Sequence, residues 1–414
     1  MSLPGLVEVS QRLWDQRVPE VAGCVRAEMD RVDLKGLLPA GGRVAITVGS
    51  RGLANLPLIV RALVEEVRRR GAEPFLVPAM GTHGGATAEG QVRLLAGLGV
   101  TEESAGAEIC STLEVELVGR TESGFPVYVD RAALGADGIV VMNRIKEHTD
   151  FAAPLESGLA KMLAVGLGNQ EGARALHARG AGALARAIPE AARVVRSQAP
   201  VLVGLAVLDN AYGETAEIRA LRPEEMEAGE QTLLRRVKRR APRLPFREID
   251  VLVVERMGKE ISGVGMDTKV LGRRLIRGEQ EFGGVRINRV MVLDLSDVSY
   301  GNAVGIGLAD ATTQRLVDKI DRQATCANMV HTGFWERGKI PLTFADDREA
   351  IAAAVSMGTR WEPGQVRLVR IRDTLHLDRL QVSEALLEEV RRHPRMEVVG
   401  EPQEMAFDAS GRLI

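Results

Sequence analysis

The sequence predicts an α/β protein made of two α/β domains with mostly parallel sheets and an interdomain cleft. Three observations predict this architecture. The chain of 414 residues is longer than one hydrophobic core usually serves. Short runs rich in β-branched residues alternate with stretches of helical periodicity, as in sheets that helices cover on both faces. A basic stretch with two prolines, 235–248, interrupts the alternation, which then restarts, so it predicts a connector.

We therefore expect an N-terminal catalytic domain over 1–242, a C-terminal domain over 247–394, and a tail over 395–414 that returns to the first domain. In the first domain, near-continuous apolar runs predict strands, which we place at 43–49, 73–81, 137–144 and 200–209. Two stretches predict helices. The first, 56–71, ends in three arginines and a glycine, and the second, 87–100, begins with the capping residue Thr87.

The second half repeats the same alternation. Apolar runs predict strands at 249–258, 289–297 and 366–373. Helical periodicity predicts helices near 308–325 and over 383–393.

Composition excludes several classes of function. The net charge of −2 gives no basic surface for a polyanion or an acidic membrane, and three Trp and three Tyr argue against base stacking. The three cysteines form no CxxC pair and no disulfide framework, which fits a reducing compartment. The N-terminus resembles no secretory signal, and no apolar run approaches the ~20 residues of a membrane span. We expect a cytoplasmic protein that binds neither nucleic acid nor membrane.

Chemically active side chains follow three of the predicted strands. Arg51 comes after 43–49, His83 after 73–81, and His148 after 137–144. Ligands of open parallel sheets bind beyond the carboxyl ends of the strands, so these residues are expected to converge. Arginine suits a carboxylate because its guanidinium offers two parallel donors. Taken alone, Arg51 is more typical of a surface arginine, and His83 and His148 could each equally be a solvated loop residue.

A second group follows in the stretch 154–177. Lys161 lies among small apolar residues, where a lysine either extends to water or is a desolvated amine with altered reactivity. His177 ends a helix-like stretch and is on its own more typical of a structural histidine. Three glycines nearly match a dinucleotide-binding loop, although their spacing is GxGxxxG; they are Gly166, Gly168 and Gly172.

In this order, GSRG, GTHGGATAEG, NRIKEHTDF, ESGLAKMLAVGLG and His177 resemble the nickel-dependent lactate racemase family. The likeness is close over about residues 45–180 and indicates a diverged branch of 2-hydroxyacid racemases or epimerases. It implies a nickel pincer nucleotide, a pyridinium-3-thioamide-5-thiocarboxylic acid mononucleotide that holds nickel through one carbon and two sulfurs. By the same resemblance, Lys161 is its covalent tether, His177 is the metal ligand, and His83 and His148 are the acid/base pair.

The resemblance also implies how substrate is bound and converted. Arg51 would bind the carboxylate of a 2-hydroxy acid, and the second domain would add Lys269, Arg273 or Arg274. The cofactor would take a hydride from the alcohol carbon and return it to the other face, while the two histidines exchange the hydroxyl proton. Proteins that mature the cofactor would be partners.

Three alternatives stay open at this stage. The three histidines His83, His148 and His177 could form the zinc site of a hydrolase. Gly166 to Gly172 could bind the nucleotide of an NAD-dependent oxidoreductase. A third possibility is a member that carries the nickel cofactor without catalysis.

Overall fold

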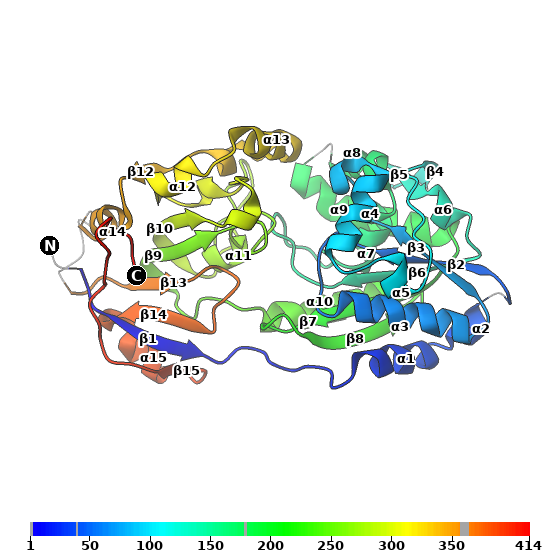
Figure 1. The fold of residues 1–414 in the computed structure, drawn as a ribbon, viewed down its shortest axis with the longest axis horizontal. Coiled ribbons are helices and arrows are strands. Elements are labelled where there is room, and N and C mark those ends of the chain that lie inside the picture. The colour runs from blue at the N-terminus through cyan, green and yellow to red at the C-terminus, as the bar shows by residue number, and fades with distance from the viewer. Residues whose placement is uncertain (1–2, 39, 178–179, 357–363) are drawn as a thin grey trace. The chain divides into compact units, whose positions relative to one another are not determined.

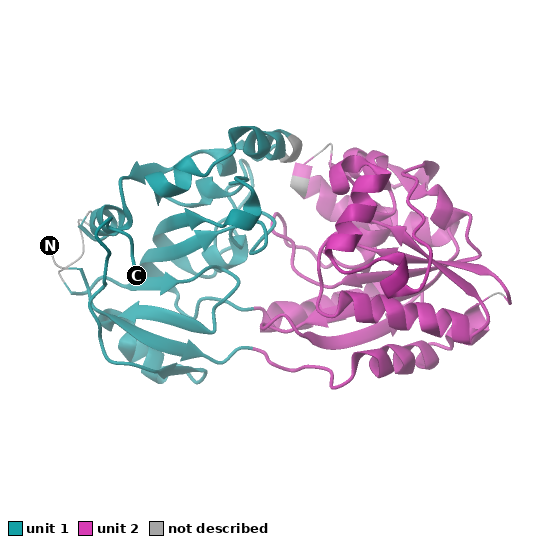
Figure 2. Cartoon of the chain, viewed as in Figure 1, with its two compact units in different colours: residues 1–13, 242–414 teal, residues 14–241 magenta. Residues whose placement is uncertain are grey.

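The computed structural model describes residues 3–38, 40–177, 180–356 and 364–414. The chain forms two compact units (Figure 2). Residues 14–241 make the central unit, and residues 1–13 together with 242–414 make the terminal unit. Among the described residues, no helix combines the length and apolar character needed to cross a membrane.

The central unit contains a five-stranded sheet in the order β3-β2-β6-β7-β8 (Figure 1). Its strands are β2 (Arg43–Val48), β3 (Glu73–Pro78), β6 (Gly138–Arg144), β7 (Val201–Asp209) and β8 (Thr215–Leu221). The pairs β3–β2, β2–β6 and β6–β7 are parallel, and only β8 runs antiparallel to its neighbour. A separate antiparallel hairpin comprises β4 (Val115–Arg120) and β5 (Pro126–Asp130). The four strands predicted from apolar runs in this half are confirmed.

Helices cover both faces of this sheet. They are α1 (Val21–Arg31), α2 (Leu34–Leu37), α3 (Leu56–Arg69), η1 (Gly84–Ala86), α4 (Ala88–Gly97), α5 (Glu102–Ala105), α6 (Arg131–Leu134), α7 (Leu159–Lys161), η2 (Met162–Gly166), α8 (Asn169–His177), α9 (Gly180–Gln198) and α10 (Met226–Arg240). Within β2, Ile46 packs in one core cluster with Leu63 of α3, and its neighbour Ala45 packs in the other with Ala187 of α9. Because successive side chains of a strand point to opposite faces, both must be apolar, which explains the continuous apolar runs.

The terminal unit contains an eight-stranded mixed sheet in the order β12-β11-β10-β9-β13-β14-β1-β15. Its strands are β1 (Leu6–Gln11), β9 (Glu248–Met257), β10 (Arg286–Leu295), β11 (Ala311–Thr313), β12 (Leu342–Phe344), β13 (Leu368–Ile371), β14 (Arg379–Ser383) and β15 (Met396–Val398). Its helices are α11 (Thr268–Leu271), η3 (Asp297–Ser299), η4 (Ile306–Leu308), α12 (Gln314–Asp318), α13 (Arg322–Thr332), η5 (Trp335–Gly338), α14 (Asp347–Ser356), η6 (Glu384–Leu386) and α15 (Leu387–Arg392). The run from β12 to β13 is parallel, and β14, β1 and β15 are joined antiparallel.

The unit boundaries differ from the expected 1–242, 247–394 and 395–414. The N-terminal strand β1 pairs with β14 and β15, so residues 1–13 belong to the terminal unit. The tail packs there as well, because the Gln403 amide donates to the Leu6 carbonyl (2.8 Å) and the Leu413 amide donates to Asp347 (2.9 Å). These pairings join residues far apart in the chain, which local patterns do not reveal.

Two predicted elements are wrong in part. The basic stretch 235–248 is not all connector, because α10 continues to Arg240 and only 241–247 separates it from β9. Lysine and arginine at the end of a helix are favoured by the helix dipole, so the same residues fit a C-terminal turn. The helix expected near 308–325 is broken, since the three-residue strand β11 precedes α12 and α13.

Candidate functional site

Three adjacent strand ends in the central unit form the candidate site. β2 lies between β3 and β6, and the three strands are parallel, so their carboxyl ends meet at one edge of the sheet. Ser50, two residues after β2, contacts Nδ1 of His83, which follows β3. This contact joins two of the strand ends and orients the exposed His83 ring through Nδ1.

The glycines around His83 are required by the fold of its loop. Gly84 has a φ of +71°, and a Cβ there would lie 2.6 Å from the Gln91 amide nitrogen at the start of α4. Only glycine tolerates both the positive φ and this approach. Thr87 caps α4 by accepting a hydrogen bond from the Gly90 amide (3.0 Å), as the sequence predicts. The bare backbone next to His83 is thus explained first by the close approach of α4.

His148 lies in a loop between β6 and α7 that two backbone hydrogen bonds close at its base, between Lys146 and Ser157 (2.8 and 3.2 Å). Its side chain is buried (8% exposed) and stacks on Phe151 with ring centroids 4.2 Å apart. Its Nε2 atom lies 2.9 Å from Nζ of Lys161. The structure therefore brings together two of the residues that the sequence singled out.

The hydrogen bonds of His148 indicate where its proton is. The Asp150 backbone amide donates to Nδ1 (3.1 Å), so Nδ1 is an acceptor and carries no proton. A neutral ring then carries its proton on Nε2 and donates it toward the Lys161 amine. An amine accepts a hydrogen bond only when it is unprotonated, so His148 donates to Lys161 only in the fraction of molecules whose amine is neutral.

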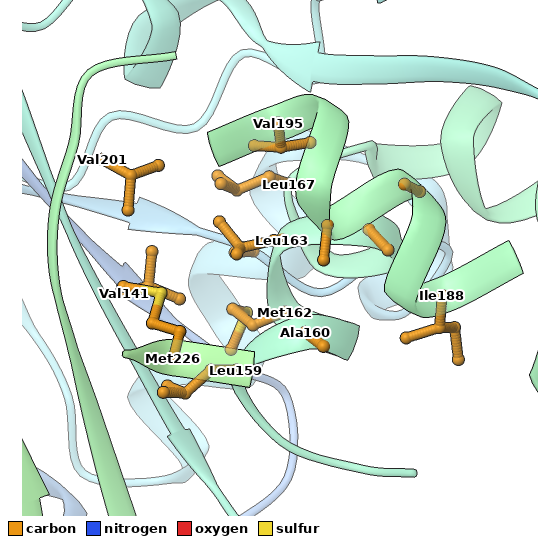
Figure 3. Close-up of a cluster of buried hydrophobic side chains, with 14 of the residues drawn as sticks. Val141, Leu159, Ala160, Met162, Leu163, Leu167, Ile188, Val195, Val201 and Met226 are labelled. Atoms are coloured by element: carbon orange, nitrogen blue, oxygen red, sulfur yellow. The ribbon is translucent and has the colours of Figure 1, made fainter. Parts of the chain in front are cut away.

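The surroundings of Lys161 also favour its neutral form. Burial lowers the pKa of Lys161 from 10.5 to about 8; the carboxylate of Asp150 opposes this shift, and the charge of Arg51 adds to it. Lys161 ends α7 and is followed directly by the π-helix η2, a rare geometry that occurs often at functional sites. Side chains of this segment, Leu159 and Leu163, pack in the core with Met226 (Figure 3). The half-buried amine is thus held on a rigid apolar base.

Arg51 lies at the same edge of the sheet. The side chain of Arg51 is exposed, but protein atoms surround its guanidinium closely enough to desolvate it in part. This desolvation lowers the pKa of Arg51, and the positive charge of Arg144 lowers it further. Arg144 ends β6 and is paired with Asp209 at 2.9 Å. Arg51 remains charged, since an arginine is not deprotonated in proteins. A like charge nearby and partial desolvation would both favour an anionic ligand beside Arg51.

His177 is the last residue of α8 and is exposed. Ala173, one turn earlier on the same helix, lies next to the His83 loop, because a Cβ at Gly81 would be 3.4 Å from its Cβ. Residues four apart share a helix face, so His177 extends the face that α8 presents to this loop.

The three candidates of the second domain lie in the terminal unit, on or just after α11. Arg273 donates to both carboxylate oxygens of Asp310 (2.9 and 3.0 Å). Arg274 is buried and donates to Glu279 (3.1 Å), and its guanidinium lies over the ring of Phe282. The ammonium of Lys269 is 5.0 Å from the centre of the same ring. Arg274 therefore holds its own loop together, and Arg273 ties that loop to the residue before β11.

Two of the alternatives lack their expected structural context. Gly166 ends a π-helix, and Gly168 and Gly172 lie in the turn and helix that follow. A dinucleotide-binding loop joins a strand to a helix, so these glycines do not form one. Across the described ranges, no three His, Cys, Asp or Glu side chains are grouped closely enough to hold a metal ion. The zinc alternative therefore has no preformed ligand set in that part of the chain.

Three polar residues that support the site were not predicted from the sequence. Ser50 contacts His83, Glu156 accepts from the His148 amide (2.6 Å), and Glu230 accepts from the Ala160 amide (2.8 Å). Ser50 could have been found from its place between a predicted strand and Arg51. Glu230 lies 70 residues from its partner, and no local pattern indicates it.

The fold and the site define an α/β domain with an arginine, two histidines and a half-buried lysine at the carboxyl end of its sheet. Residues 15–185, which include all five candidate residues of the central unit, match the family model of the lactate racemase N-terminal domain. The predicted resemblance to the lactate racemase family is confirmed over these residues. No curated protein matches the chain. Among solved structures, the lactate racemase apoprotein from Thermoanaerobacterium thermosaccharolyticum matches with 12% identity and a TM-score of 0.46, over 82% of this chain and 98% of that one.

Proposed function

We propose that the chain is a racemase or epimerase of a 2-hydroxy acid that works with a nickel pincer nucleotide tethered to Lys161. The observation that carries the proposal is the contact between His148 Nε2 and Lys161 Nζ within a lactate racemase N-terminal domain. An amine with a pKa of about 8 has an unprotonated fraction at neutral pH, which covalent attachment through nitrogen requires. When bound, the cofactor would supply the acceptor and donor of the hydride.

The residues present fit this group. Lys161 offers a nucleophilic nitrogen on a rigid segment, and His177 offers an imidazole on α8, whose neighbouring turn contacts the His83 loop. One histidine ligand from the protein is enough when the cofactor itself supplies three donors, so a cluster of three protein ligands is not needed. Imidazole also suits nickel in a planar site.

The other side chains would then handle substrate. Arg51 would bind the carboxylate and hold the substrate in one orientation. His83 and His148 come from the ends of two different strands, and each would take or return the hydroxyl proton at one face of the alcohol carbon. The roles of Lys269, Arg273 and Arg274 in substrate binding stay predictions.

The decisive experiment is co-expression with a cofactor-synthesis pathway. We expect nickel in the purified protein, an adduct on the peptide with Lys161 in mass spectra, and interconversion of the enantiomers or epimers of a 2-hydroxy acid in chiral chromatography. Lys161→Ala should lose the adduct, whereas the exposed Lys35→Ala, a matched control in the same unit, should keep it. Wild-type protein that contains no nickel after this co-expression would refute the proposal, and zinc in place of nickel would favour the hydrolase.

The three cysteines are free thiols, which supports the expected cytoplasmic location.

A further inference from the structure

The helix that carries Lys161 has no capping side chain of its own. Its N-cap residue is Gly158, so no side chain there can accept a hydrogen bond from the first amides of α7. Glu230 of α10 supplies the missing acceptor: it accepts from the Ala160 amide at 2.8 Å and also from the Leu159 amide. Glu230 is 2% exposed, and a Cβ at Gly158 would collide with its Oε1 atom. The missing side chain at Gly158 thus leaves the room that the Glu230 carboxylate needs to cap α7.

The loop that carries His148 is held by a second buried carboxylate. Glu156 accepts from the amides of His148 (2.6 Å) and Ala153 (3.0 Å), and it is 1% exposed. Its partner is Lys238, which is ion-paired with Glu156 and donates to the Ala153 carbonyl (2.9 Å). A buried carboxylate that loses such a partner is strongly destabilised, so Lys238 holds this loop in place through Glu156.

Both supports come from one helix. Glu230 and Lys238 lie eight residues apart on α10, about two turns. Between them, the buried side chains of Leu233 and Leu234 anchor the helix in the core. One rigid element therefore contacts both chain segments whose side chains meet at 2.9 Å.

We propose that α10 is the positioning element of the site, and that Glu230 and Lys238 are the positioning residues that hold Lys161 and His148 in contact. This inference rests on the proposed function, which assigns the roles of Lys161 and His148. In this role neither positioning residue acts on substrate or cofactor directly. Glu230 acts through the start of α7, and Lys238 acts through Glu156 and its loop.

The charge state of Glu230 is compatible with this role. Burial raises the pKa of Glu230 to about 7, while the amides of Ala160 and Leu159 and the charge of Arg196 oppose the shift. A carboxyl group accepts hydrogen bonds from amides whether or not it is ionised, because one oxygen remains an acceptor. The cap therefore persists on both sides of neutral pH.

The first test measures Lys161 in cofactor-free protein. The rate at which acetic anhydride modifies Lys161 is followed against pH by peptide mass spectrometry, which gives the pKa of the amine. In Glu230→Ala and Glu230→Asp, the second of which keeps the charge but shortens the side chain, α7 should loosen. The amine then gains water, and its pKa should rise by about one unit or more toward 10.5. Glu230→Gln keeps an acceptor of the right length and should stay near the wild-type value.

The second test measures the loop by amide hydrogen exchange. Lys238→Met should speed exchange of the peptide that contains His148 and Ala153 about tenfold, and Lys238→Arg, which keeps the charge, should restore most of the protection. The matched controls are the exposed residues Glu224→Gln and Arg239→Met, which should change neither measurement.

The outcomes are separable from those of the proposed function, since neither test needs nickel, cofactor or turnover. Wild-type values for the Lys161 pKa in folded Glu230→Asp, together with unchanged exchange in Lys238→Met, would overturn the positioning role. If Glu230 had only a structural role, replacing it would lower overall stability but leave the pKa of Lys161 in the folded protein unchanged. Glu230→Gln would then not differ from Glu230→Ala and Glu230→Asp in the pKa of Lys161.

Discussion

Replacing Lys161 by methionine should stabilise the cofactor-free protein while removing its function. The ammonium of Lys161 is costly in the folded state, because burial lowers the pKa of this amine to about 8. Methionine has a similar length and no charge to desolvate. The expected gain is therefore a direct measure of how strongly the site disfavours a charged lysine.

The magnitude follows from the two pKa values. A fall from 10.5 to about 8 corresponds to at most about 3 kcal/mol of unfavourable free energy at neutral pH. Since the side chain is half-buried, water reduces this cost, and losing the hydrogen bond to His148 offsets about 1 kcal/mol. We expect Lys161→Met to raise the free energy of unfolding by about 1–2 kcal/mol at pH 7.

The pH dependence gives a sharper result than the size of the gain. Below about pH 8 the lysine is charged in both the folded and the unfolded protein, so the folded state bears the full cost. Between about 8 and 10.5 the folded amine is already neutral while the unfolded one still carries its proton, so the wild type becomes more stable as pH rises. The advantage of Lys161→Met should therefore decline over this range.

The assay is urea unfolding followed by circular dichroism at neutral and alkaline pH, with the transitions of the two units fitted separately. Lys35→Met, an exposed change in the same unit, is the control and should show no pH-dependent difference from the wild type. A variant whose difference from the wild type stays constant from pH 7 to about 10.5 would refute the reasoning that burial lowers the pKa of Lys161.

Three further predictions concern the site. His83→Ala and His148→Ala should each abolish interconversion in loaded enzyme while nickel stays bound; loss of nickel in both would show that ligand and base roles were interchanged. Arg51→Lys should raise KM for the 2-hydroxy acid about tenfold with a smaller effect on kcat, measured by steady-state kinetics, because an ammonium cannot replace two parallel donors. Gly158→Ala should displace Glu230 and destabilise the protein by about 1–3 kcal/mol in urea unfolding, and an unchanged stability would contradict the proposed fit.

Much of the central sheet could be predicted from sequence, because strands covered on both faces must be continuously apolar. β2 and β6 show this clearly, and their parallel pairing places Arg51 and His148 at one edge. The sequence predicts apolar neighbours for Lys161, but it does not decide whether the amine of Lys161 has an altered reactivity. Its contact with His148 depends on how the intervening loop folds, and that loop is held by Glu156.

The positioning residues Glu230 and Lys238 could not be predicted from local sequence patterns, for a physical reason. Glu230 reads as one more polar residue of an amphipathic helix, and only the packing of α10 against α7 shows that it is buried. Lys238 belongs to a basic run that resembles a linker, although its stem is covered and its ammonium is paired. In both cases tertiary contacts, rather than periodicity, decide the role of the residue.

The placement of β1 has a consequence for how the chain matures on the ribosome. Leu6–Gln11 is synthesised well before its sheet partners, Arg379–Ser383 and Met396–Val398. At translation speeds of roughly 5–20 residues per second, this strand waits on the order of 20–70 s with open hydrogen-bonding edges. The segment 14–241 can complete its own core in that interval, so during synthesis the central unit should fold before β1 pairs with β14 and β15.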